Sequence, residues 1–132
     1  LNIAGIAGLH ASLGWILDES MAYLCEHDQL QRKALLKILR SYHFVKIVGD
    51  NESNQYVGIV SCVIDGLPSD TAASVFAEKN IAVRSGLQCA PLAHKTLGTF
   101  PSGTIRFSCS AFTGDDDFVQ LSQTLEFIKK NI

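Results

Sequence analysis

The first third of the chain carries apolar residues at helical spacing. Between residues 8 and 42, large aliphatic side chains recur every three or four positions, with charged and amide side chains between them: Leu9, Leu13, Ile16, Leu17, Leu24, Leu35, Leu36 and Leu39. This period predicts one long helix or two helices in series. The expected break is Asp18-Glu19-Ser20, because an Asp or Ser side chain there can cap a second helix.

From Phe44 the pattern changes to that of β-strands. FVKIVG alternates apolar and polar side chains, DNESN is a cluster of turn formers, and YVGIVSCVI is a β-branched run. Together they predict an antiparallel hairpin.

Shorter elements follow the hairpin. A helix is expected to open at Leu67-Pro68-Ser69-Asp70, where a proline and capping oxygens stand together, and to continue to Asn80. IAVRS predicts a short strand, a brief helix starts after Pro91, and residues 98–103 form a loop.

The last strand and the last helix lie near the end of the chain. TIRFSCSAF predicts a strand, with Ile105, Phe107 and Cys109 on one face and Arg106, Ser108 and Ser110 on the other. Thr113-Gly-Asp-Asp has the spacing of a capping box, so the final helix is expected to run from Asp115 towards Lys130. The order of elements predicts an α+β fold: a small, mostly antiparallel sheet with helices packed on it, as a single domain over residues 1–132.

Composition narrows the class of protein. Hydrophobic residues make up 47% of the 132 positions, charged residues 18%, and the formal net charge is -2, which is typical of a soluble globular domain and offers nucleic acid no basic patch. No apolar run approaches the roughly 20 residues of a membrane span, and no signal peptide is indicated, so a cytoplasmic protein without a membrane partner is expected. The chain begins with Leu1 and its only methionine is Met21, so it is expected to be part of something longer.

The cysteines are too widely spaced for a disulfide scaffold or a zinc site. They are Cys25, Cys62, Cys89 and Cys109. Free thiols are expected, and no metal is, because neither Cys25 with His27 nor Cys89 with His94 has a second pair to complete a tetrahedron.

One of these thiols stands apart. Cys62 and Cys109 lie in predicted strands and Cys25 lies among the apolar positions of a helix, where cysteine behaves as a small buried hydrophobe. Cys89 instead follows a glycine-containing turn and precedes a proline, which places it on a loop. Arg84 and the start of the following helix would both lower the pKa of its thiol, which favours a nucleophile. Spacing alone equally allows a small residue that the loop merely tolerates.

Arg106 stands in the middle of an otherwise apolar strand, where a guanidinium needs a partner. An internal acid such as Asp65 is the simpler explanation. A ligand carboxylate held by both arms of the guanidinium is the alternative. Lys95, in a His-Lys pair that also occurs where pyridoxal phosphate is bound, is expected to face solvent.

These motifs resemble a known family. IAVRSGLQCAPLAHKTLG followed by GTIRFSCSAFTGDDDFVQL is similar to the carboxy-terminal part of the pyridoxal-phosphate-dependent cysteine desulfurases of the class V aminotransferase group, and NIAGIAGLHASLGWI resembles the segment that leads into their small domain. The resemblance implies that Cys89 is the catalytic thiol that takes sulfur from L-cysteine as a persulfide and leaves alanine. It also implies that Arg106 grips the substrate carboxylate and that Arg84 helps orient the substrate.

The same resemblance sets expectations for the whole enzyme. The residues that hold pyridoxal phosphate are expected upstream of Leu1, so residues 1–132 would be a carboxy-terminal small domain that neither binds the cofactor tightly nor acts alone. The parent would be a homodimer, with a sulfur-acceptor protein as a further partner. The alternatives to a cysteine desulfurase are another class V aminotransferase, a selenocysteine lyase, or a cofactor-free sulfur-relay or interaction domain. Gln88 departs from the family, whose members often carry histidine before the thiol.

Overall fold

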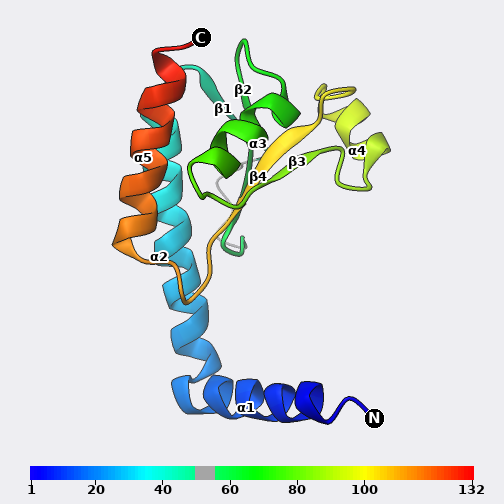
Figure 1. Ribbon diagram of the computed structural model, residues 1–132, viewed down its shortest axis with the longest axis vertical. Coiled ribbons are helices and arrows are strands. Elements are labelled where there is room, and N and C mark those ends of the chain that lie inside the picture. Colours follow the sequence, from blue (N-terminus) through cyan, green and yellow to red (C-terminus); the bar gives the residue numbers. More distant parts are fainter. Residues whose placement is uncertain (50–55) are drawn as a thin grey trace.

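The computed structural model describes residues 1–49 and 56–132 (Figure 1). Its elements are α1 (Ile3–Glu19), α2 (Met21–Arg40), β1 (Val45–Val48), β2 (Ile59–Ile64), α3 (Ser69–Glu78), β3 (Arg84–Gly86), α4 (Pro91–Thr96), β4 (Thr104–Ser108) and α5 (Asp115–Lys129). The predicted turn DNESN lies outside the described residues. Among those residues, no helix is both long and apolar enough to cross a membrane.

The strands form one sheet in the order β1-β2-β4-β3, and every neighbouring pair is antiparallel. The predicted hairpin is therefore confirmed, with Val45 opposite Ile64. The α+β class with an antiparallel sheet is confirmed as well.

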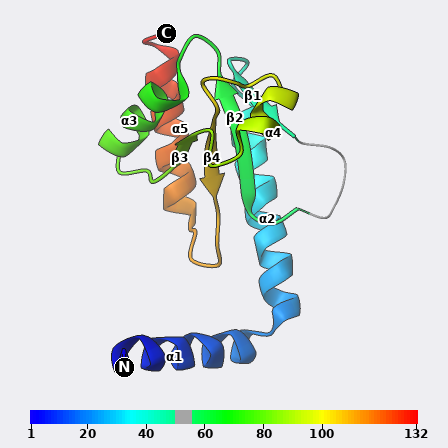
Figure 2. The same ribbon diagram turned by 90° about the vertical axis from the view of Figure 1, so that its right-hand side faces the viewer.

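Helices α2, α3 and α5 pack on one face of this sheet (Figure 1). The alternation of side chains along each strand turns its apolar residues to those helices. In the core, Phe76 of α3 is fully buried and meets Phe107 of β4 edge to face, with ring centroids 5.2 Å apart. Figure 2 looks onto the face of the sheet that is turned away from α2 and α5.

The predicted break between the first two helices is confirmed at Ser20. This residue has φ 67°, and its hydroxyl accepts a hydrogen bond from the Tyr23 N–H at 3.3 Å, which caps α2. As a result α1 runs roughly across the end of α2 (Figures 1 and 2). No residue of α1 is buried. Besides α2, the helix contacts Phe112, on whose ring Trp15 stacks with the ring centroids 5.1 Å apart.

Several predicted boundaries shift, and hydrogen bonds explain the shifts. β3 begins at Arg84 rather than residue 81, because the Ile81 N–H donates to the Phe76 carbonyl at 2.8 Å and ties this segment to α3. β4 ends at Ser108 rather than residue 112, because Ser110 and Thr113 bond to one another in a turn.

The predicted helix caps also differ in detail. The Thr113 hydroxyl accepts from the Ser110 N–H, so Gly114 becomes the N-cap of α5, and its N–H donates to the Asp117 carboxylate at 2.9 Å. No side chain caps α3, since the Ser69 hydroxyl donates instead to the Ser102 carbonyl.

Candidate functional site

Cys89 lies on the turn between β3 and α4, and its side chain is exposed. The predicted loop position is therefore confirmed. The turn is sharply wound: Gly86, Gln88 and Cys89 have φ values of 85°, 49° and 63°, and the Ala90 N–H donates to the Leu87 carbonyl at 2.8 Å. A positive φ is uncommon for residues other than glycine, so the two at Gln88 and Cys89 must be held by their surroundings.

The turn that carries Cys89, called the thiol turn below, lies against the start of β4. A Cβ added to Gly103 would lie 2.2 Å from the carbonyl carbon and oxygen of Gly86, and Gly103 itself has φ 75°. A Cβ at Gly86 would meet nothing within 4 Å, so the close approach requires a glycine at 103, whereas at 86 it is the φ of 85° that favours one. The thiol turn therefore leaves the sheet at the point where β4 begins.

The side chain of Gln88 connects this turn to both strands. Its Nε2 atom lies 3.5 Å from the carbonyl oxygen of Arg84 in β3 and 3.4 Å from the Oγ1 atom of Thr104 in β4, and it donates to both. Thr104 is only 2% exposed. The turn is thus tied to the rigid part of the sheet by a side chain as well as by its backbone.

Both predicted arginines lie on one face of the sheet, directly beside each other. Arg84 of β3 is opposite Arg106 of β4, and Arg106 is opposite Ser61 of β2 on its other side. Directly opposite residues on antiparallel strands have Cβ atoms about 5 Å apart and point to the same face. Because two like charges at this spacing repel each other, the pair favours an anion.

Asp65 is not the partner of Arg106, so that expectation was wrong. Asp65 pairs with Lys46 on the neighbouring strand, Oδ2 to Nζ at 2.7 Å. Within residues 1–49 and 56–132, neither Arg84 nor Arg106 makes an ion pair, and the buried Nε atom of Arg106 has no hydrogen-bond acceptor. A buried donor without an acceptor is costly, and a bidentate carboxylate would satisfy it.

Cys62 is buried and Cys109 is partly buried, whereas Cys89 is exposed. Burial raises the pKa of Cys62 to about 12. Burial, followed by the negative charges of Asp28 and Asp117, raises the pKa of Cys109 to about 11. Both therefore stay protonated near neutral pH, which makes them poor nucleophiles.

Cys25 corrects a prediction. It was expected to be a buried residue of a helix, but its side chain is exposed on α2. Helical spacing could not show this, because the part of α2 near Cys25 lies beyond the sheet (Figure 1). Cys25 and Cys89 are therefore the two exposed thiols among the described residues.

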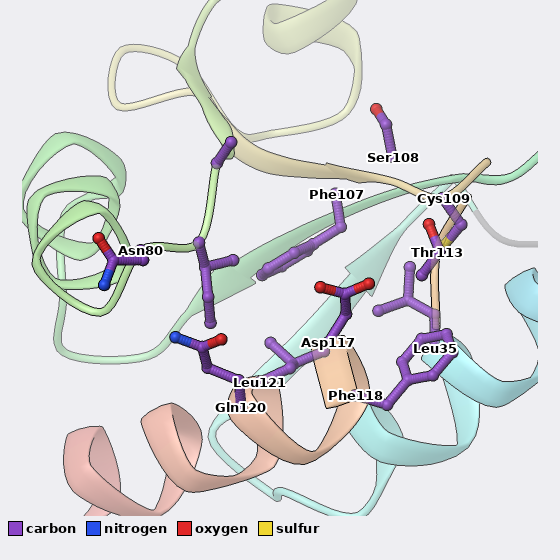
Figure 3. Close-up of a pocket in the computed structure, with 12 residues that line it drawn as sticks. Leu35, Asn80, Phe107, Ser108, Cys109, Thr113, Asp117, Phe118, Gln120 and Leu121 are labelled. Atoms are coloured by element: carbon purple, nitrogen blue, oxygen red, sulfur yellow. The ribbon is translucent and has the colours of Figure 1, made fainter. Parts of the chain in front are cut away.

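A cavity of about 290 Å³ lies elsewhere, between α5, the end of β4 and the segment after α3 (Figure 3). Phe107 and Leu121 line its apolar side, and Asp117 stands at its polar side. That carboxylate already accepts a hydrogen bond from the Gly114 N–H. The cavity is lined by none of Cys89, Arg84 and Arg106.

The described residues do not fit a pyridoxal phosphate pocket. Such a pocket needs a lysine for the Schiff base and an acid for the pyridine nitrogen. Lys95 is exposed, with its Nζ 5.2 Å from the centroid of the Phe100 ring, and Lys46 is engaged by Asp65. One further cavity is lined by both a lysine and an acid, Lys79 and Glu78. There the Lys79 Nζ lies over the Phe127 ring, 4.6 Å from its centroid.

Two contacts of the candidate site were not predicted from sequence motifs. The position of Ser61 beside Arg106 depends on pairing between residues 45 positions apart, for which the sequence carries no local signal. The contact of Gly86 with Gly103 has a partial signal, since glycines mark both ends of the connection. The structure does not test the chemical roles predicted for Cys89, Arg84 and Arg106, which remain predictions.

Comparison with known proteins matches nearly the whole chain. The family model described as aminotransferase class-V matches residues 1–121. A probable cysteine desulfurase from Pseudomonas putida is 30% identical over 131 residues, covering 96% of this chain and 31% of that protein. Another from Methanothermobacter thermautotrophicus is 32% identical over 130 residues, covering 97% of this chain and 32% of that protein. The chain thus spans about a third of the length of these curated relatives.

Solved structures show the same fold. The apo structure of a cysteine desulfurase from Thermococcus onnurineus NA1 matches with a TM-score of 0.88 at 25% identity, over 99% of this chain and 32% of that chain. The cysteine desulfurase CsdA from Escherichia coli matches with a TM-score of 0.83 at 20% identity, over 100% of this chain and 32% of that chain. The second likeness concerns the fold alone.

Proposed function

This chain belongs to the class-V aminotransferase family, and from that premise we propose that it is the carboxy-terminal, thiol-bearing small domain of a cysteine desulfurase-like enzyme. The observation that carries the proposal is the arginine pair: Arg84 and Arg106 stand side by side, neither forms an ion pair with an acid among residues 1–49 and 56–132, and the edge strand of their sheet leads to the exposed Cys89. An amino-acid carboxylate suits this pair, and a thiol suits sulfur transfer.

In this proposal Arg106 holds the carboxylate of L-cysteine, and Arg84 orients the substrate beside it. The Cys89 thiolate then bonds to the substrate sulfur. The carbon–sulfur bond of the substrate breaks with its electron pair going to carbon, and a proton added there completes alanine. The sulfur remains on Cys89 as a persulfide, whose exposed position allows transfer to a thiol acceptor such as another protein.

We place the cofactor pocket in another part of the parent enzyme. Membership of this family implies pyridoxal phosphate in the parent, whereas among the described residues Lys95 is exposed and Lys46 is paired with Asp65. The chain alone is therefore proposed to be inactive. We further propose that the parent is a homodimer that acts in the cytoplasm.

The surface of α1 supports a larger parent. Five of its large apolar side chains form an exposed stripe along one face: Ile3, Ile6, Leu9, Leu13 and Leu17, between 52% and 80%. An apolar stripe of this kind normally packs against other parts of a complete protein. Since the chain spans about a third of its relatives, the remaining polypeptide is the proposed cover. A Leu9→Cys variant tests this: its thiol should be alkylated rapidly in the chain alone and be protected in the parent enzyme, and equal rates would refute the proposed cover.

The test of the reaction uses the parent enzyme loaded with its cofactor. With L-cysteine, Cys89→Ser should abolish release of sulfide and formation of persulfide. The matched control is Cys25→Ser, which removes the other exposed thiol and should retain both. Sulfur release by the Cys89→Ser enzyme at the normal rate would show that the nucleophile is assigned wrongly. Selenocysteine and other amino acids, supplied to the same enzyme, distinguish a desulfurase from a selenocysteine lyase or an aminotransferase.

The carboxylate role of Arg106 has its own test. A hydrogen-bonded charge pair contributes about 1.5–3 kcal/mol, so Arg106→Gln should raise KM for L-cysteine by roughly 10- to 150-fold. Cysteamine lacks the carboxylate and should react equally, though slowly, with both enzymes. An equal loss with both substrates would show that Arg106 acts on structure rather than on the carboxylate.

A further inference from the structure

We propose that Gln88 is the positioning residue of the sulfur nucleophile: its side-chain amide locks the turn that carries Cys89 onto the first residues of β3 and β4. This inference rests on the proposed function for the role of Cys89. The contacts of Gln88 themselves do not depend on it.

The conformation of the turn requires such a lock. Gln88 and Cys89 are consecutive residues with positive φ, a region of backbone space that side chains other than glycine seldom occupy. The Ala90 N–H bond to the Leu87 carbonyl closes the turn but does not join it to the sheet. Without a further contact, the backbone at Cys89 would relax towards a commoner conformation, and the thiol would move with it.

The Gln88 amide supplies this contact through its nitrogen. A primary amide has two N–H donors on one nitrogen, and here Nε2 approaches the Arg84 carbonyl and the Thr104 hydroxyl. Arg84 and Thr104 belong to neighbouring strands, and Thr104 is only two residues from Arg106 along β4, about 7 Å at the rise of a strand. The same bridge thus sets the turn relative to both proposed substrate-binding arginines.

An amide is also a tether that does not titrate. It keeps the same two N–H donors at every pH of an assay, so the tether itself does not depend on pH. A histidine at this position would change its donors near its own pKa of about 6.5. We therefore expect no ionisation from residue 88 in the pH profile of the enzyme.

The first test measures the lock itself by amide hydrogen exchange of residues 84–92 in the parent enzyme. Gln88→Ala should raise the exchange rate of the Ala90 N–H at least tenfold. Leu92→Ala is the matched control: its side chain is 76% exposed on α4, and it should leave exchange unchanged. Unchanged exchange in the Gln88→Ala protein overturns the inference, whether or not the enzyme is a desulfurase.

The second test connects the lock to catalysis. Gln88→Ala should lower kcat for L-cysteine tenfold or more and leave KM within twofold, because the arginines still hold the carboxylate. Thr104→Val, which removes one acceptor, should reproduce part of the loss, and Thr104→Ser, which restores a hydroxyl, should recover it. An active wild-type enzyme with an unaffected Gln88→Ala variant refutes the positioning role alone. A wild-type enzyme that releases no sulfur from cysteine refutes the proposed function, and the exchange experiment still decides the lock.

Discussion

Replacement of Gly103 by alanine tests the contact on which the thiol turn rests. Gly103 is buried with φ 75°, and its new Cβ would lie 2.2 Å from the carbonyl of Gly86, a separation that non-bonded atoms do not reach. Both residues adjoin paired strands, so neither backbone can move without breaking ladder hydrogen bonds. The substitution therefore combines a conformational cost with a steric one.

The two costs can be separated with Gly98. It has φ 70°, close to the φ of Gly103, but a Cβ there meets nothing within 4 Å. A left-handed conformation costs an L-residue about 1–2 kcal/mol, and forcing an extra group into a packed site costs about 1–3 kcal/mol more. Gly98→Ala should therefore lower the free energy of unfolding by about 1–2 kcal/mol, and Gly103→Ala by about 2–5 kcal/mol.

Urea unfolding of both variants, followed by far-UV circular dichroism, measures the difference. For a protein of this size an m-value of about 1–3 kcal/mol/M converts the expected difference into a midpoint shift on the order of 1 M. The m-values of both variants should match that of the unsubstituted chain. If the two glycine variants agree within about 0.5 kcal/mol, the backbones of Gly86 and Gly103 are not in contact and the description of the turn is wrong.

Three further outcomes are expected. Phe76→Ala should cost about 3–5 kcal/mol in urea unfolding, because it empties a fully buried site against Phe107; a loss below about 1 kcal/mol would contradict this packing. Burial raises the pKa of Cys62 from 9.0 to about 12, so the unfolded chain releases this proton first, and the unfolding free energy should fall as pH rises from about 9 towards 12. Cys62→Ala should reduce that fall, and an identical pH dependence in the variant would refute the burial. Phe112→Ala should red-shift the emission of Trp15, the single tryptophan, and increase its quenching by acrylamide; unchanged fluorescence would show that the two rings do not stack.

Local sequence patterns were sufficient for most elements of this fold. The helical period before Phe44, the break near Ser20 and the alternation in β2 and β4 all depend on neighbours within a few residues, and all are found in the structure. The loop position of Cys89 follows in the same way, from a glycine before it and a proline after it. The predicted ends of strands and helices were less accurate than the elements themselves. These ends depend on hydrogen bonds, such as those of Ile81 and Ser110, that short-range preferences do not include.

The arrangement of the candidate site was decided only by the tertiary structure. Arg84 and Arg106 are neighbours because β3 pairs with β4 in one register, and a slip of one residue would place them on opposite faces. The same pairing brings Gly86 against Gly103, while Asp65 pairs with Lys46 rather than with Arg106. The sequence by itself determined which side chains could do chemistry and which elements carry them. Their relative positions depend on strand pairing between distant segments, which is set by packing of the whole core rather than by any local pattern.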